Sequence, residues 1–205
     1  MKRRYQSIDD LVPLITIHSY SKDHVLSSPV SLIVVGRKSL IIKSFQQHGW
    51  FLAEQINPIS AVRAGLATFF NLSYHKGPMY DSYVDGRPHV LGFEKPTQTD
   101  SFRRRHHLRL WKTRYYLNHK PVWIGTISYD RGVGLKKGSL LPIHHTNPTL
   151  RLEEDFLAKT FGVQKPIYVV LSRKESGTMY SGDSYIWDGQ ALLIEIDKRN
   201  TQPSP

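Results

Sequence analysis

The sequence predicts an α+β fold in which a mostly antiparallel sheet of about six or seven strands packs with about three helices. Short apolar or alternating runs rich in β-branched and aromatic residues indicate the strands. Three longer stretches with apolar residues at helical spacing separate groups of these runs. No internal repeat or low-complexity tract occurs, which favours one ordinary globular domain.

The two longest predicted strands form a hairpin. They are separated by "NHK" at 118–120, and each alternates apolar with polar residues. A second hairpin is predicted around Asp188-Gly189, and a glycine-rich basic loop over 131–140. The predicted strands cover 29–36, 50–54, short pieces of 80–93, 106–117, 121–130, 166–172 and the two arms of 183–196.

Three helices are predicted from their start and stop signals. The first covers 37–49 and ends at a glycine. The second covers 57–71, with Asn57 as its N-cap and Pro58 in the first turn. The third covers 147–162 and repeats this Asn-Pro opening. One apolar stripe runs along the second helix, formed by Ile59, Val62, Leu66, Phe69 and Phe70.

Length and composition predict one domain. The 205 residues divide into an N-terminal entry segment (1–28), a single domain (29–197) and a disordered tail (198–205). No apolar run reaches the roughly 18 residues of a membrane span, so a cytoplasmic protein, soluble or peripheral to the membrane, is expected. The absence of cysteine excludes disulfides, thiolate nucleophiles and cysteine-based zinc sites.

Positive charge is concentrated in one segment. The net charge is +11, and residues 101–140 hold ten Lys or Arg against one acid, Asp130. Such a field attracts phosphates, anionic lipid head groups or nucleic acid, although a solvated basic face is the simpler interpretation. Nucleic acid is disfavoured because no recognisable binding module accompanies the charge.

The candidate site begins in the segment "RRRHHLRLW" at 103–111. Strand periodicity places His107 and Arg109 on one face, opposite a leucine face. The hairpin register predicts Asp130 opposite Leu108, close enough to orient His107 or Arg109, or to form a structural salt bridge.

A second candidate lies in "IHHTNP" at 143–148. It places His144 before a helix N-terminus, where free backbone N–H groups around Asn147 and Thr149 can bind an anion. The alternative is that these residues only cap the helix. Glu153 falls on the apolar side of that helix, so it either lies at the rim or meets an Arg or His of the sheet, for which the basic hairpin is the natural source.

Several motif classes are absent. No histidine spacing matches a metal template, and no nucleophile elbow, phosphate-binding loop or dinucleotide fingerprint occurs. We therefore predict no metal and no cofactor.

Four segments in order resemble the LssY C-terminal domain family. They are "DGRPHVLGFEKP" (85–96), "RRRHHLRLW" (103–111), "PVWIGTISYDRGV" (121–133) and "IHHTNPTLRLEEDFL" (143–157), and the resemblance covers roughly 29–162. Domains of this family often follow membrane regions similar to DedA proteins or lipid-phosphate phosphatases. The resemblance implies an envelope or phospholipid context and no particular reaction.

The resemblance extends to single positions. The residues that fit the family pattern are Arg87, His107, Arg109, Trp111, Asp130 and His144. The chain departs from the pattern at Asn147, Thr149 and Arg151, where the family pattern has aspartates. This departure weakens the case for a metal and for catalysis.

Two functions follow as hypotheses. The first is a non-catalytic module that binds an anionic, phosphate-bearing ligand, such as a small molecule or a phospholipid head group. It would also fit a membrane surface or a membrane-protein or secretion partner. Arg109 and Arg87 would supply bidentate contacts, with Asn147 and Thr149 adding a helix-end contact. The second is a phosphoesterase-like hydrolase in which His107 and His144 transfer protons and Asp130 orients them.

Overall fold

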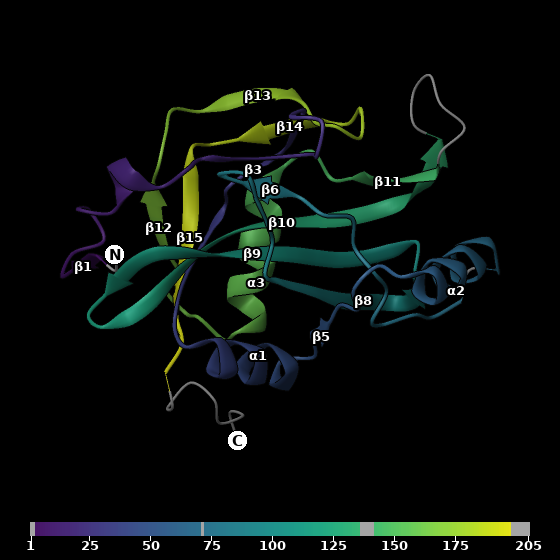
Figure 1. Cartoon of the computed structure of the whole chain (residues 1–205), viewed down its shortest axis with the longest axis horizontal. Helices are drawn as coiled ribbons and strands as arrows, with labels where there is room; N and C mark the ends of the chain where they lie inside the picture. The colour runs from purple at the N-terminus through teal and green to yellow at the C-terminus, as the bar shows by residue number, and fades with distance from the viewer. Residues whose placement is uncertain (1–2, 71, 136–141, 198–205) are drawn as a thin grey trace.

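The centre of the molecule is a mixed nine-stranded sheet (Figure 1). The computed structural model describes residues 3–70, 72–135 and 142–197. The main path of the sheet is β12-β15-β4-β10-β9-β8-β5, with β1 beside β9 and β11 beside β10. Its strands are β1 (Arg3–Tyr5), β4 (Leu32–Val35), β5 (Phe51–Leu52), β8 (Leu91–Ser101), β9 (Arg104–Leu117), β10 (Lys120–Leu135), β11 (Pro142–Thr146), β12 (Ile167–Val170) and β15 (Gln190–Glu195).

This architecture confirms the α+β class and enlarges the predicted sheet. The pairs β15–β4 and β1–β9 are parallel, and the other pairs are antiparallel. Two strands of this large sheet were not predicted, because β1 has only three residues and β11 has five, with a polar, histidine-rich sequence. Two small sheets complete the fold. They contain β2 (His18–Tyr20), β3 (Leu26–Pro29), β6 (Tyr83–Val84) and β7 (Arg87–Pro88), and separately β13 (Glu175–Thr178) and β14 (Ser184–Trp187).

The three predicted α-helices are present as α1 (Lys38–Gln47), α2 (Pro58–Phe70) and α3 (Leu150–Thr160), together with a short 3-10 helix, η1 (Val12–Leu14). The α1 and α3 helices pack on one face of the sheet, where Phe45 and Leu157 meet Leu108 and Trp123 in one core. None of the helices in the described ranges is long and apolar enough to cross a membrane.

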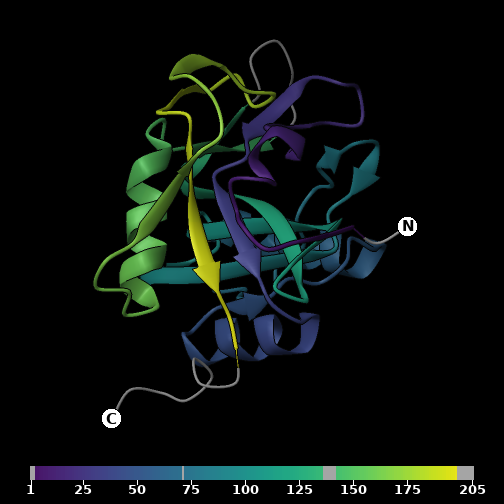
Figure 2. The ribbon, with the colours of Figure 1, turned by 90° about the vertical axis from the view of Figure 1, so that its left-hand side faces the viewer.

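The opposite face is covered by the N-terminal segment. Leu11 is fully buried there beside Trp111 and Ile124. Figure 2 shows α3 and the N-terminal segment on opposite sides of the sheet. The strand β1 also pairs with β9, with Arg3 opposite Tyr115. The described part of the entry segment is therefore built into the same domain.

The β9–β10 hairpin is confirmed, but its register differs from the predicted one. The turn has two residues, Asn118 and His119, both with positive φ (45° and 64°), as in a type I′ turn. An irregularity at Pro121 then leaves two extra residues in β9. As a result Asp130 pairs with Arg105, three positions from the predicted Leu108.

The predicted hairpin over 183–196 is wrong. The turn exists, with Gly189 at φ 83°, but its two strands enter different sheets. β14 pairs with β13, whereas β15 pairs with β12 and β4. Because Ala191, Leu192 and Ile194 are buried on both sides of β15, this strand suits the interior of the large sheet.

Three further boundaries differ or lie outside the structure. The α3 helix begins at Leu150, because Pro148 precedes an N-cap at Thr149. The predicted loop after Asp130 is still strand as far as Leu135. Residues 136–140, which form the rest of that loop, and the predicted tail 198–205 lie outside the described residues.

Candidate functional site

A buried charge network occupies the sheet face opposite α1 and α3. We use this name for Glu94 of β8, Arg105 and His107 of β9, and Asp130 of β10, all of which are buried. The register places His107 opposite Glu94, and Arg105 opposite Asp130. Because side chains alternate along a strand, Arg105, His107 and Arg109 project from the same face.

Arg105 joins the two carboxylates of the network. Its Nη1 lies 2.6 Å from Glu94 Oε1, and its Nε lies 3.2 Å from Asp130 Oδ2. The guanidinium carbon is also 4.0 Å from the centre of the Phe102 ring. A Cβ at Gly77 would lie 2.7 Å from Arg105 Nη1, so glycine lets the chain close over the network at this point. A paired, enclosed arginine of this kind satisfies the rule that buried charges need partners.

Asp130 contacts His107 as well as Arg105. The distance from His107 Nδ1 to Asp130 Oδ1 is 3.2 Å. Burial lowers the pKa of His107 below its ordinary value, and Asp130 opposes this shift. The imidazole is therefore neutral near pH 7, held on one side by a carboxylate. The sequence predicted that Asp130 meets His107 or Arg109, and the orienting role stays a prediction.

Burial has a strong effect on the carboxyl group of Glu94. Burial raises its pKa to about 8, while Arg105 opposes the shift and Asp130 adds to it. Two carboxylates close together cannot both ionise easily, so Glu94 retains its proton near pH 7. The network then holds one negative charge on Asp130 and one positive charge on Arg105.

Arg109 differs from Arg105, although both lie on the same face of β9. In the part of the chain that the structure describes, Arg109 makes no hydrogen bond or ion pair, and its Nε is shielded from solvent without an acceptor. Burial lowers its pKa, with Asp130 opposing, but a guanidinium remains charged in proteins. Arg109 is thus a partly buried cation that lacks a counter-ion in the described chain.

The surroundings of Arg109 are polar and close-packed. Its strand neighbours are Gly92 in β8 and Thr126 in β10, and Met79 fills the space over the glycine. Burial, followed by the charge of Arg109, lowers the pKa of His89 to about 3, so this imidazole is neutral. Its Nδ1 lies 3.7 Å from Asp81 Oδ1 at the exposed rim.

Arg87 lies on the same face, whereas the residues at the start of α3 make no described contact with Arg109. The backbone oxygen of Arg87 accepts a hydrogen bond from the indole of Trp111, two residues after Arg109, and the Arg87 side chain is exposed. Asn147 and Thr149 lie at the start of α3, where the Asn147 side chain accepts a hydrogen bond from the Thr149 N–H. The Asn147 N–H donates to the Tyr129 backbone oxygen and Thr149 pairs with Ile186, and no contact in the described residues joins either of them to Arg109.

His107 and His144 are not neighbours along the sheet. His107 pairs with Ser128 of β10, and His144 pairs with Val133 five residues later. At about 3.3 Å per residue this separation is roughly 16 Å along β10, and the two histidines lie on opposite edges of that strand. The side chain of His144 lies outside the described residues. The backbone therefore does not support a shared proton-transfer pair.

Sequence reasoning missed Glu94 and Arg105 as members of the network. The signal for Arg105 was its position two residues before His107, in phase with Arg109. Glu94 follows Phe93 in a strand with no other sign of a buried charge, and only the β8–β9 register places it opposite His107. The predicted partner of Glu153, in contrast, is confirmed, because His106 Nδ1 lies 2.6 Å from Glu153 Oε2.

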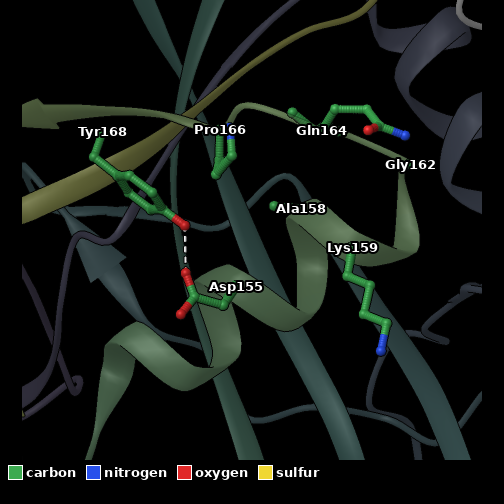
Figure 3. A pocket seen from close by; sticks show the side chains of 8 residues that line it. Asp155, Ala158, Lys159, Gly162, Gln164, Pro166 and Tyr168 are labelled. Atoms are coloured by element: carbon green, nitrogen blue, oxygen red, sulfur yellow. Dashed lines mark hydrogen bonds between the residues drawn. The ribbon is translucent and has the colours of Figure 1, made fainter.

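A separate open cleft of about 380 Å³ lies between α3 and β12 (Figure 3). Its polar lining includes Asp155, Lys159 and Tyr168, and the Tyr168 hydroxyl donates a hydrogen bond to Asp155. Burial raises the pKa of Tyr168 to about 12, so the phenol remains a donor. No residue of the charge network lines this cleft. In the described ranges no group of three or more His, Asp or Glu is placed to hold a metal ion.

Comparison with known proteins adds a family. A family model described as LssY C-terminus matches residues 12–191. This range includes α2, the charge network, Arg109 and α3. No curated protein and no solved structure matches the chain significantly.

Proposed function

The chain belongs to the LssY C-terminus family, and we propose that it is a non-catalytic module that binds a phosphate-bearing anion through Arg109. One observation carries the proposal. Of the two arginines on this face of β9, Arg105 is paired with Glu94 and Asp130, whereas Arg109 has no counter-ion in the described chain. A partly buried cation without a partner is unfavourable alone and is stabilised when an anion binds.

The ligand class follows from the donors. A planar guanidinium binds phosphate oxygens in a bidentate manner. Arg87 supplies a second cation, which is exposed, from the segment that hydrogen-bonds to Trp111. Neutral His89 and His107 add hydrogen-bonding groups without adding charge. This chemistry suits a free phosphate compound and a phospholipid head group equally.

Thermal unfolding with added ligands tests the anion site. A phosphate compound at 100 times its dissociation constant should stabilise the protein by about 2.7 kcal/mol. Inorganic phosphate, pyrophosphate and glycerol phosphate would represent free compounds, and a short-chain phosphatidylglycerol would represent a head group. The effect should disappear in Arg109→Met. This variant should fold, because removing Arg109 leaves no carboxylate without its cation.

The matched control is Arg114→Met, which removes an exposed arginine of the same hairpin and should leave the stabilisation intact. Stabilisation that survives in Arg109→Met would contradict the proposed site. The same is true if none of these compounds stabilises the wild-type protein.

A phosphoesterase-like hydrolase is the second candidate, and the contact between Asp130 and His107 favours it. A carboxylate that holds a neutral imidazole is the arrangement of a general base. His144 does not stand beside it, so His107 would have to act alone, with Arg109 binding the phosphoryl group. Release of inorganic phosphate from a phosphomonoester, abolished in His107→Gln but not in His106→Gln, would establish this alternative.

A further inference from the structure

The α2 helix exposes the apolar stripe formed by Ile59, Val62, Leu66, Phe69 and Phe70. These side chains are between 50% and 75% exposed. Two neighbours in the chain, Ile56 and Leu72, are also half exposed. Large apolar side chains gathered on one exposed helix face mark a surface that meets another apolar body.

The orientation of this stripe is fixed by contacts on the other side of the helix. Ser60 and Ala67 are buried there. Asn57 Oδ1 accepts a hydrogen bond from the Ser60 N–H at 2.9 Å and holds the first turn. Arg103 donates to the backbone oxygens of Thr68 (2.6 Å) and Phe69 (3.1 Å) and holds the last turn. The helix is thus anchored with its apolar side outward, at one end of the long axis of the molecule (Figure 1).

The described charged side chains on the helix and at the start of β9 are positive, and the nearby Glu54 accepts a hydrogen bond from Tyr74, which also interacts with Arg63. The helix sequence, PISAVRAGLATFF, contains no Asp or Glu, and Arg63 is exposed beside the stripe. The turn between β8 and β9 adds Arg103, which holds the end of the helix, and the exposed Arg104. An apolar stripe bordered by cations fits a surface that is apolar inside and negatively charged outside.

We propose that α2 docks the domain on a bilayer that contains anionic lipids. The helix lies in the plane of the interface, with Phe69 and Phe70 in the acyl boundary and the arginines among the head groups. Its 13 residues span about 20 Å, which suits a helix lying along the surface. The inference rests on α2 and not on Arg109, so it goes beyond the proposed anion site.

A second copy of the chain is a poorer occupant. A two-fold contact between α2 helices would bring Arg63 of each copy toward the other. A strip about 20 Å long and about 10 Å wide also offers much less than the roughly 800 Å² per partner of a stable interface.

Vesicle binding by the full chain tests the proposal. Wild-type protein should bind vesicles of phosphatidylcholine mixed with phosphatidylglycerol more tightly than vesicles of phosphatidylcholine alone. Phe69→Ser/Phe70→Ser should weaken binding at least about tenfold, because two large apolar groups no longer enter the bilayer. Arg63→Gln and Arg104→Gln should each weaken binding to the mixed vesicles about fivefold, the equivalent of about 1 kcal/mol per cation.

The matched control is Ile167→Ser/Val170→Ser, which removes two apolar side chains of similar exposure, 60% and 62%, from the edge strand β12. This variant should bind vesicles as the wild type does. In an Arg109→Met background, Phe69→Ser/Phe70→Ser should weaken vesicle binding by the same factor as in the wild type, which separates this surface from the anion site.

A tryptophan placed in the stripe reports insertion directly. The four native tryptophans, Trp50, Trp111, Trp123 and Trp187, are at most 3% exposed. In Phe69→Trp the new indole is the one that vesicles can reach, so its emission should shift to the blue and be quenched by lipids with brominated chains.

Three results would overturn the proposal. One is equal binding of the wild type and Phe69→Ser/Phe70→Ser to the mixed vesicles, and another is no binding by either. The third is a dimer of the wild type that Phe69→Ser/Phe70→Ser dissociates while vesicles have no effect, since the stripe would then be an interface between two copies.

Discussion

Two regions of this molecule depart in opposite directions from the usual distribution of polar and apolar residues. On the β8–β10 face, Glu94, Arg105 and Asp130 are ionisable groups in the interior. On α2, Phe69 and Leu66 are apolar groups at the surface. Charged residues are rarely fully buried without partners, and contiguous apolar surface is rare on monomers.

The two departures differ in how they are compensated. Within the charge network both carboxyl groups contact the Arg105 guanidinium, so most of the desolvation penalty is offset inside the chain. Around α2, no described residue covers the stripe, so its compensation has to come from outside. Arg109 is the residue of the β8–β10 face that resembles the α2 stripe in this respect. No counter-ion for it lies in the described chain, so its charge is not compensated there. Both proposed binding surfaces are therefore places where no group within the described chain compensates for a buried charge or covers an exposed apolar surface.

The largest expected effect comes from breaking the internal compensation. Asp130→Asn removes the carboxylate that contacts Arg105 and His107 and leaves a buried cation with one partner. The variant should lose about 3–5 kcal/mol of unfolding free energy, measured by urea denaturation. Asp188→Asn is the control, because its pair with Arg151 is partly exposed and should contribute about 1 kcal/mol or less. If both variants lost the same unfolding free energy, burial would not make the contacts of Asp130 stronger than those of the partly exposed Asp188.

A smaller effect is expected from core truncation, and it compares the two helices that have an Asn-Pro pair at their start, α2 and α3. Leu157→Ala in α3 removes a fully buried side chain and should destabilise the protein by about 2–5 kcal/mol. Leu66→Ala in α2 removes a half-exposed side chain and should change stability by no more than about 0.5 kcal/mol. If the two substitutions cost the same in thermal or urea unfolding, the α2 stripe would be packed in solution.

The smallest effect concerns the proton on Glu94. Its pKa is raised from 4.5 to about 8, so within this window the native state holds a proton that the unfolded state has released. The free energy of unfolding should therefore fall as pH rises, by up to about 1.4 kcal/mol per pH unit. Glu94→Gln should flatten this slope.

The slope is best measured between pH 6.5 and 8. The lowered pKa of His89 affects stability only below its ordinary value of 6.5, where stability falls as pH falls. Glu154, whose pKa burial also raises to about 8, adds a parallel slope, so Glu94→Gln/Glu154→Gln should be flatter still. An unchanged slope in both variants would mean that Glu94 is ionised beside Arg105.

Sequence alone determined what local physics controls. All three helices could be predicted from the Asn-Pro openings, the glycine that follows α1 and the apolar periodicity. The alternation of apolar and polar residues, together with a turn signal, was sufficient to predict the β9–β10 hairpin. The same alternation placed His107 and Arg109 on one face. The partner of Glu153 followed from its position among apolar neighbours, because a buried carboxylate needs a cation or a donor.

Tertiary structure decided which strands pair, in what register, and which surfaces remain uncovered. A two-residue turn and two extra residues in β9 moved Asp130 from Leu108 to Arg105, and register is sensitive to every such residue. The same apolar periodicity was buried in α3 and exposed in α2, because periodicity describes one face of a helix and not what lies against it. Whether Arg105 or Arg109 would be paired depended on carboxylates from two other strands, which only the folded sheet brings together.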